Sequence, residues 1–178
     1  MERVCENYGI MDFKVNRDNK VWIITVLTLA VLASAVALAF IYAYMVTRWI
    51  VTVIAIAIVA AGALMCPVKL RITSTGIVLF KLIGKKRFPY CDMKNIALCD
   101  LQTAPNIRIF GSGGFMGYTG WFYNKQIGRF YAFIGSMYRT ILITMNNGNQ
   151  YVVSCLNPDK LVEISRTNLR ATKNRLQK

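Results

Sequence analysis

The chain has 178 residues and a formal net charge of +14, and 55% of its residues are hydrophobic. That apolar fraction exceeds the roughly 45 to 50% of soluble globular domains, so membrane-spanning segments are the first expectation. Histidine is absent, which excludes Ser-His and Cys-His catalytic pairs and removes the commonest metal ligand.

Residues 1–20 are predicted to be a cytoplasmic N-terminal segment, because they mix both charge signs and precede a long apolar run. Within them, MDFKV at Met11–Val15 alternates apolar and polar residues as a short strand does. We interpret the segment as a loose tail, with a short strand as the alternative.

Residues 21–66 are predicted to form a transmembrane helical hairpin. Val21–Met45 carries no charge, and at about 1.5 Å per residue it exceeds the roughly 30 Å of a bilayer core. After VTR, Trp49–Cys66 is also uncharged. A core helix of a soluble protein seldom stays uncharged on every face for so long, and the apolar part of a signal peptide is shorter, so both alternatives are disfavoured.

Basic residues flank the outer ends of the two predicted spans. Lys14, Arg17 and Lys20 precede the first span, six Lys or Arg residues from Lys69 to Arg87 follow the second, and the connection carries only Arg48. Lys and Arg concentrate on the cytoplasmic side of membrane proteins. The sequence therefore predicts a multi-pass protein of the cytoplasmic (inner) membrane with both termini in the cytoplasm.

The positive charge is concentrated after Cys66, where 17 of the 22 basic residues and four of the eight acidic residues leave a charge of +13. A basic domain beside an anionic leaflet gains roughly 1 kcal/mol per well-placed Lys or Arg. Nucleic acid is the competing partner for such charge, but no nucleic-acid-binding motif is present, so none is expected. Membrane lipids are the expected partners, together with a protein partner or a homo-oligomer.

Residues 67–165 are predicted to form an antiparallel β domain of about seven strands that ends in a helix. VKLRIT alternates, GIVLFKL, KRFPY and NIALCDL follow, and NNGN at Asn146–Asn149 predicts a tight hairpin between TILITM and QYVVSC. Asn157 as N-cap and Pro158 at the first helical position predict a helix from about residue 158. Residues 166–178 are predicted to form a basic tail or an extension of this helix, which is expected to fray beyond Thr172.

Four pieces in this order resemble the bacterial pleckstrin-homology-like (PH-like) family that follows membrane spans. They are VKLRIT with GIVLF, RFPYCDMKNI, GGFMGYTGWFYNKQIGRFYAF, and GNQYVVSCLNPDKLVEIS, and together they cover about Val68–Ser165. The resemblance implies a partly open β-barrel with a helix plugging one end. The expected fold class is thus a membrane-anchored α+β protein, in which a two-helix transmembrane hairpin precedes an antiparallel PH-like β-barrel with a C-terminal helix.

Glycine and aromatic residues crowd residues 110–136. A dinucleotide-binding fingerprint fails there because its third glycine would fall on Met116, and a P-loop fails because no glycine is followed by Lys and then Ser or Thr. We interpret the glycines as permitting bulges and bends, and the aromatic residues as filling the barrel or facing the lipid interface. The five cysteines lack metal-ligand spacing and are expected to be reduced thiols, so neither a cofactor nor a metal is predicted.

The candidate binding site is the basic turn KLIGKKRF, with Lys81, Lys85, Lys86 and Arg87 as speculative lipid- or partner-binding residues. In several eukaryotic PH domains a similar arrangement on an early loop holds inositol phosphates, but this turn is expected to join the second and third strands after the spans. The favoured alternative to a specific binding site is a turn whose charges are solvated or interact non-specifically with anionic lipid.

The predicted function is a non-catalytic, membrane-anchored PH-like module that binds a protein partner or anionic lipid headgroups at the cytoplasmic face. No base partners the acidic residues of the domain, so an enzyme is not expected. The alternative is a subunit of a membrane transport or lipid-handling assembly in which the transmembrane hairpin is the functional part. The two differ in whether enlarging small residues of the spans abolishes function.

Overall fold

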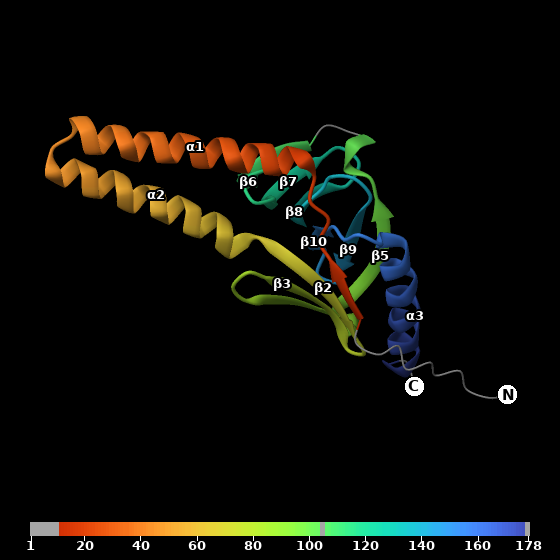
Figure 1. Cartoon of the computed structure of the whole chain (residues 1–178). Coiled ribbons are helices and arrows are strands. Elements are labelled where there is room, and N and C mark those ends of the chain that lie inside the picture. The colour runs from red at the N-terminus through yellow and green to blue at the C-terminus, as the bar shows by residue number, and fades with distance from the viewer. Residues whose placement is uncertain (1–10, 104–105, 177–178) are drawn as a thin grey trace.

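The structure is a computed structural model that describes residues 11–103 and 106–176. An apolar helical hairpin projects from one side of a β domain, and a third helix covers the opposite side (Figure 1). The helices are α1 (Asn19–Tyr42), α2 (Met45–Met65) and α3 (Pro158–Leu176), with short 3-10 turns at Tyr90–Asp92 and Leu101–Thr103.

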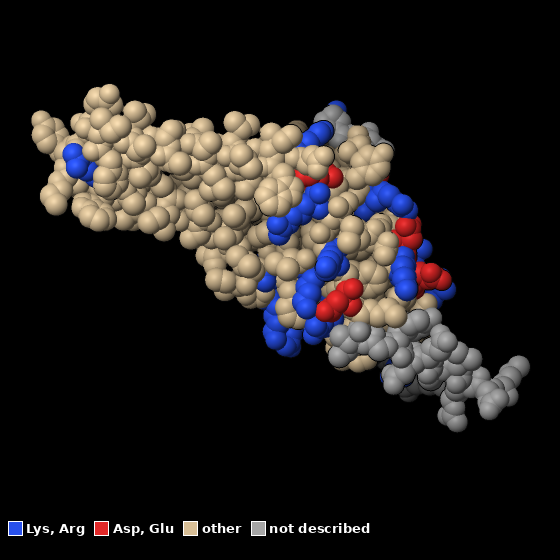
Figure 2. Space-filling view, in the orientation of Figure 1, with Lys and Arg blue, Asp and Glu red and all other residues tan. Residues whose placement is uncertain are grey.

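The predicted hairpin is confirmed as two helices long and apolar enough to cross a membrane, with 24 residues in α1 and 21 in α2. No residue of α2 is buried, and in α1 the buried residues are Val21, Thr25 and Ala39, so most of both apolar surfaces is exposed, unlike that of a soluble core helix. Their surface is almost free of charged side chains (Figure 2). The helices meet in a connection where the Arg48 Nε donates to the Ala43 carbonyl at 2.8 Å.

The strands form two sheets. The four-stranded sheet has the order β1-β2-β3-β4 and the six-stranded sheet has the order β5-β9-β10-β8-β7-β6. The strand bounds are β1 Met11–Lys14, β2 Pro67–Thr73, β3 Gly76–Lys81, β4 Lys85–Pro89, β5 Met93–Cys99, β6 Asn106–Gly113, β7 Tyr118–Asn124, β8 Gly128–Ile134, β9 Thr140–Met145 and β10 Gln150–Val153.

The antiparallel β domain with a C-terminal helix is confirmed, with two differences in detail. Within the described residues, nine strands follow the hairpin instead of about seven, and together with β1 they build two sheets instead of a single partly open barrel. One pair, β8 with β10, is parallel. The reason is that the predicted β9–β10 hairpin inserts between β5 and β8, so β10 meets β8 in the same direction.

The first strand corrects the expectation of a loose N-terminal tail. β1 pairs with β2 in antiparallel register, Phe13 lies opposite Leu70, and Phe13 is 8% exposed. The Val15 N–H continues the pairing by donating to the Val68 carbonyl at 3.2 Å. An apolar side chain thus tied into the core keeps residues 11–14 ordered. Residues 1–10 lie outside the described residues.

The last helix corrects the expectation of fraying beyond Thr172. α3 continues to Leu176, and Leu161 and Leu169 are buried in the main core beside residues of both sheets. The Lys173 ammonium donates to the Lys94 carbonyl of β5 at 3.0 Å. Packing against β5 therefore stabilises helical turns that a basic sequence by itself would leave marginal.

Candidate functional site

The predicted basic turn joins β3 to β4, which are the second and third strands after the hairpin, as expected. It lies beside the end of α2, because the Leu82 N–H donates to the Cys66 carbonyl at 3.1 Å. Gly84 adopts a positive φ of 88°, which closes the turn. The tip is apolar, with Leu82 61% and Ile83 66% exposed. An apolar tip with cations behind it is thus held next to the base of the hairpin.

The four cations predicted as a site do not form one cluster. Lys81 places its Nζ 5.2 Å from the centre of the Phe133 ring, and Lys86 places its Nζ 5.3 Å from that of Tyr151. Both rings belong to the six-stranded sheet. Because side chains alternate along a strand, Lys85 and Arg87 point to the opposite face of β4. The structure therefore separates Lys85 and Arg87 from Lys81 and Lys86.

Lys85 and Arg87 belong instead to a larger basic surface, the outer face of the four-stranded sheet. We call it the basic sheet face. Its members are Asp12, Lys14, Lys69, Arg71, Val78, Phe80, Lys85 and Arg87. The alternate residues of the same strands, such as Leu70, Ile77 and Phe88, are fully buried on the inner face. Five cations and one carboxylate thus share one surface.

The register arranges this face in two rows. The row nearer the hairpin consists of Lys14, Lys69, Phe80 and Lys85, and the farther row consists of Asp12, Arg71, Val78 and Arg87. The Lys69 Nζ and the Arg71 Cζ lie 5.2 Å and 5.1 Å from the Phe80 ring centre. In Figure 2, Lys and Arg gather over β1 and β2 with an acidic patch among them.

Asp12, the carboxylate of the basic sheet face, is paired with two of its cations. Its carboxylate accepts from the Arg71 Nε at 2.6 Å and from the Lys69 Nζ at 2.9 Å. Hydrogen bonds first from Arg71 and then from Lys69 hold the pKa of Asp12 far below its usual range. Among the residues that the structure describes, no such ion pair involves Lys14, Lys85 or Arg87. The excess positive charge therefore lies at the ends of the rows.

The glycine-aromatic stretch docks the domain onto the hairpin, and its structural interpretation is confirmed. The β6–β7 turn meets both helices: the Met116 N–H donates to the Thr25 Oγ1 at 3.0 Å, and the Cys66 thiol donates to the Met116 carbonyl at 3.2 Å. A Cβ on Gly62 would lie 2.2 Å from the Phe115 ring. Close backbone approach is therefore what the glycine permits here.

Three aromatic residues of the stretch help to fill a second core. Tyr118, Phe122 and Phe130 are buried together with Val21, the third residue of α1. Phe122 and Phe130 stack with ring centres 6.0 Å apart. The base of α1 is thus part of the folded domain as well as part of the hairpin.

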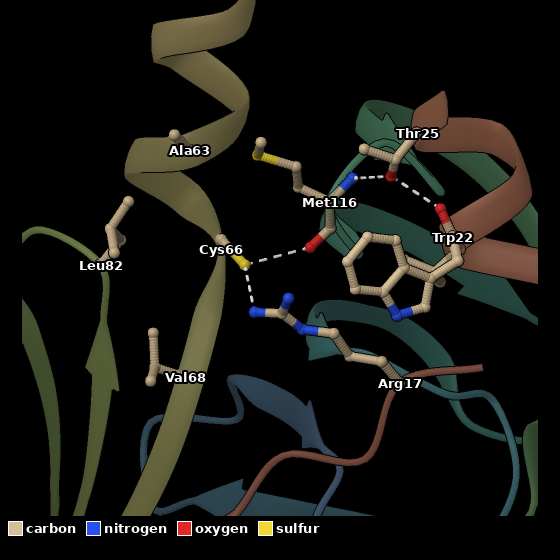
Figure 3. A pocket seen from close by; sticks show the side chains of 9 residues that line it. Arg17, Trp22, Thr25, Ala63, Cys66, Val68, Leu82 and Met116 are labelled. Carbon is tan, nitrogen blue, oxygen red and sulfur yellow. Dashed lines mark hydrogen bonds between the residues drawn. The ribbon is translucent and has the colours of Figure 1, made fainter. Parts of the chain in front are cut away.

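A pocket of about 240 Å³ lies at this junction, between the bases of both helices, the β6–β7 turn and the β3–β4 turn. Figure 3 shows Arg17, Trp22, Thr25, Ala63, Cys66, Val68, Leu82 and Met116 around it. The Arg17 Nη2 donates to the Cys66 sulfur at 3.1 Å. Apart from that edge and Thr25, the lining is apolar.

Sequence reasoning missed both the sheet face and the pocket. The alternation of VKLRIT places Lys69 and Arg71 on one face, which is a readable signal, but their cross-strand neighbours depend on β1. Arg17 and Thr25 carried a weaker signal, a cation before and a hydroxyl within an apolar run. Nothing in the sequence around Arg17 or Thr25 indicates that Arg17 contacts Cys66 or that Thr25 contacts Met116.

The Cys155 thiol does not have the environment of a nucleophile. Burial raises the pKa of Cys155 to about 11, so this thiol stays protonated at neutral pH. Within residues 11–103 and 106–176, no group of three or more His, Cys, Asp or Glu side chains is placed to hold a metal ion. The arrangement offers cations on a sheet face and an apolar pocket, which suit binding of anionic and amphiphilic groups.

The family comparison agrees with this architecture. The model of the bacterial PH domain matches residues 68–168, more than half of the chain. No curated protein and no solved structure matches the chain. The matched region begins within β2 and ends within α3, so it holds nearly all of both sheets and leaves out β1 and the hairpin. The chain therefore belongs to the bacterial PH domain family.

Proposed function

We propose that the chain is a non-catalytic module, anchored in the cytoplasmic membrane by α1 and α2, whose PH domain binds anionic lipid headgroups through the basic sheet face. Both termini face the cytoplasm in this proposal, because the cations beside the outer ends of α1 and α2 outnumber the single Arg48 near their connection. The observation that carries the proposal is the row of Lys14, Lys69 and Lys85 beside the base of the hairpin.

The position of this row supports lipid as its ligand. The Val15 N–H donates to the Val68 carbonyl and the Leu82 N–H donates to the Cys66 carbonyl, so the end of β1, the start of β2 and the β3–β4 turn all lie at the base of the hairpin. With the hairpin in a bilayer, the lysine row lies near the headgroups, where each cation contributes about 1 kcal/mol on an anionic leaflet. The exposed Leu82 and Ile83 enter the interface beside α2.

The test uses a soluble form in which a short Gly-Ser turn replaces residues 16–66, which keeps β1 paired with β2. Its binding to phosphatidylcholine vesicles with and without phosphatidylglycerol is measured by sedimentation. Changing Lys85 and Arg87 together to Ala is expected to weaken binding to the anionic vesicles by about 2 kcal/mol, roughly 30-fold.

Lys86→Ala is the matched control, since Lys86 has the same charge and lies between the two on the other face of β4. Its effect is expected to be the smaller. The proposal would be overturned if the double variant bound anionic vesicles as tightly as the parent. It would also be overturned if Lys86→Ala lost as much binding as the double variant. Binding to an acidic protein in place of vesicles would favour the protein partner.

In a second candidate function, the chain is a subunit of a membrane transport or lipid-handling assembly, and the hairpin is its functional part. An apolar groove of about 690 Å³ runs between α1 and α2, and small residues line it, including Ala33, Ala37, Ala55 and Ala60. Small residues let a further helix approach closely within lipid. Ala33→Leu with Ala60→Leu is expected to abolish co-purification of a membrane partner under this function, whereas Ala57→Leu, outside the groove, leaves it intact.

A further inference from the structure

The pocket at the base of the hairpin combines one cation with apolar walls. Arg17 lies at its edge, two residues before α1 begins, and Trp22, Ala63, Leu82 and Met116 supply the apolar side chains (Figure 3). We propose that this pocket binds one anionic phospholipid from the cytoplasmic leaflet, with the phosphate on Arg17 and the start of an acyl chain along Trp22 and Ala63. The proposal rests on the membrane placement of the hairpin and does not need the basic sheet face to bind.

The bonding of Arg17 is the first argument. A guanidinium carries five donors in a planar fork that fits a phosphate with two parallel hydrogen bonds. Arg17 donates a hydrogen bond to the Cys66 sulfur, which is a weak acceptor. In the described part of the chain, Arg17 makes no ion pair with a carboxylate. A phosphate would therefore replace a weak partner with a strong one.

The depth of the lining residues is the second argument. Val21, Trp22 and Thr25 lie in the first two turns of α1, and Ala63 lies in the last turn of α2. With both helices in a bilayer, Arg17 lies at headgroup level and Ala63 below it. Trp22 is 58% exposed at this boundary, where membrane proteins place tryptophan. The cation-to-apolar order of the pocket thus matches that of a phospholipid.

The size of the pocket limits what it encloses. Its volume of about 240 Å³ is below the roughly 300 to 1,000 Å³ of pockets that bury a whole drug-sized ligand. A phospholipid needs only its glycerophosphate region and the first part of one chain inside, because the remainder stays in the bilayer. A water-soluble ligand would have no such second environment.

The test uses the full chain in nanodiscs, with Trp49→Phe and Trp121→Phe so that Trp22 is the remaining tryptophan. Its fluorescence is recorded while dibrominated phosphatidylglycerol, or dibrominated phosphatidylcholine, replaces unlabelled phosphatidylcholine. Bromine quenches a tryptophan that it contacts. We expect saturable quenching with an apparent preference of about tenfold for phosphatidylglycerol, from a charge-assisted phosphate contact.

Two variants remove different parts of the site, and each has a matched control. Arg17→Ala is expected to abolish the preference, whereas Lys20→Ala, a neighbouring cation outside the pocket lining, retains it. Ala63→Phe fills the pocket and is expected to abolish the saturable component, whereas Ala61→Phe on the same helix retains it. Lipid that merely surrounds the helices would quench Trp22 in proportion to its mole fraction in every variant, and that result would overturn the proposal.

The test also separates this site from the basic sheet face. Retention of the tenfold preference in a Lys85→Ala, Arg87→Ala chain supports the pocket independently of the sheet face. If the preference for phosphatidylglycerol is lost in the Lys85→Ala, Arg87→Ala chain but kept in Arg17→Ala, the pocket proposal is wrong and the proposed function is still supported. Saturable quenching by both lipids to the same extent in the parent would show an apolar pocket without a phosphate contact and would likewise contradict the proposal.

Discussion

Phe13 and Leu70 lie directly opposite each other in paired antiparallel strands, although the whole apolar hairpin separates them in the sequence. The hairpin is therefore inserted between two adjacent strands of one sheet. Its two ends leave the domain side by side, at Val15 and Val68, where the pairing of β1 with β2 ends. The base of α1 is thus connected through Val15 to the edge strand β1, and the base of α2 leads directly into the neighbouring strand β2.

This relationship predicts how a soluble domain must be made. A chain in which a short Gly-Ser turn replaces residues 16–66 is expected to fold, because the turn closes a strand pair that already exists. A fragment that starts at Pro67 lacks β1 and exposes Leu70 and Ile72 at a sheet edge. Chemical unfolding of the two forms should show the longer one to be more stable; equal stability would mean that β1 contributes nothing.

Phe13 is expected to account for much of that difference. It is 8% exposed within the main core, and truncating a buried phenylalanine to Ala costs about 3 kcal/mol or more. Phe13→Ala in the soluble form should lower the free energy of unfolding accordingly, as measured by urea titration. Lys14→Ala, next in the strand with an exposed side chain, is the control and should change it by less than about 0.5 kcal/mol.

The ion pairs of Asp12 predict a pH dependence of stability. Its folded pKa lies below the unfolded value of about 3.9, so its stabilising effect is present at neutral pH and is lost as the pH falls below about 4. Because Asp12 is 39% exposed, solvent limits the effect to about 1 kcal/mol. The parent's free energy of unfolding should exceed that of Asp12→Asn at pH 6, and urea titrations should show this difference shrinking as the pH falls to 2. A difference that stays constant would exclude the ion pairs as its cause.

Thr25 is predicted to hold the β6–β7 turn on α1. Its hydroxyl donates to the Val21 carbonyl at 2.6 Å and accepts from the Met116 N–H at 3.0 Å. Thr25→Val keeps the shape but leaves the Met116 N–H without its acceptor, at a cost of about 1 to 3 kcal/mol. Hydrogen exchange of peptides around Met116, measured in nanodiscs, should be faster in Thr25→Val and unchanged in Thr25→Ser. Unchanged exchange in both would show that the bond does not secure the turn.

Gly62 and Phe115 are predicted to be energetically coupled. A Cβ at position 62 would meet the Phe115 ring, so Gly62→Ala should displace the ring and loosen the turn. Phe115→Ala should remove that penalty, so the two changes together are expected to cost less than the sum of each one. Thermal unfolding of the full chain in detergent for the four members of this cycle measures the coupling. If the destabilisation of the double variant equals the sum of the two single effects, the Phe115 ring does not contact position 62.

Local patterns predicted most of the elements. The uncharged runs predicted both helices, Asn146–Asn149 predicted the β9–β10 turn, and Asn157 with Pro158 predicted the start of α3. Each signal acts over a few neighbouring residues, because charge exclusion, turn geometry and helix capping are local effects. The ordered pieces of the β domain likewise indicated the PH family that the match over residues 68–168 shows.

Other features depend on residues that are distant in the sequence. The loose-tail interpretation of Met11–Val15 was wrong because its decisive contact, Phe13 with Leu70, crosses the hairpin. Lys81, Lys85, Lys86 and Arg87 looked like one cluster in the sequence, yet strand alternation and the rings of Phe133 and Tyr151 divide them. Charge composition does not reveal which face of a strand a cation occupies when the neighbouring strand is unknown.

Two apolar helices, a basic β domain and a terminal helix could be predicted from the amino-acid sequence, since hydropathy, charge and capping are properties of short segments. The tertiary structure alone decided that β1 completes the sheet across the hairpin, that five cations share one face with Asp12, and that Arg17 meets Cys66 beside a pocket. These contacts join side chains that are distant in the sequence and meet only in the folded chain. Strand register and the close approach of the β6–β7 turn to both helices set their geometry.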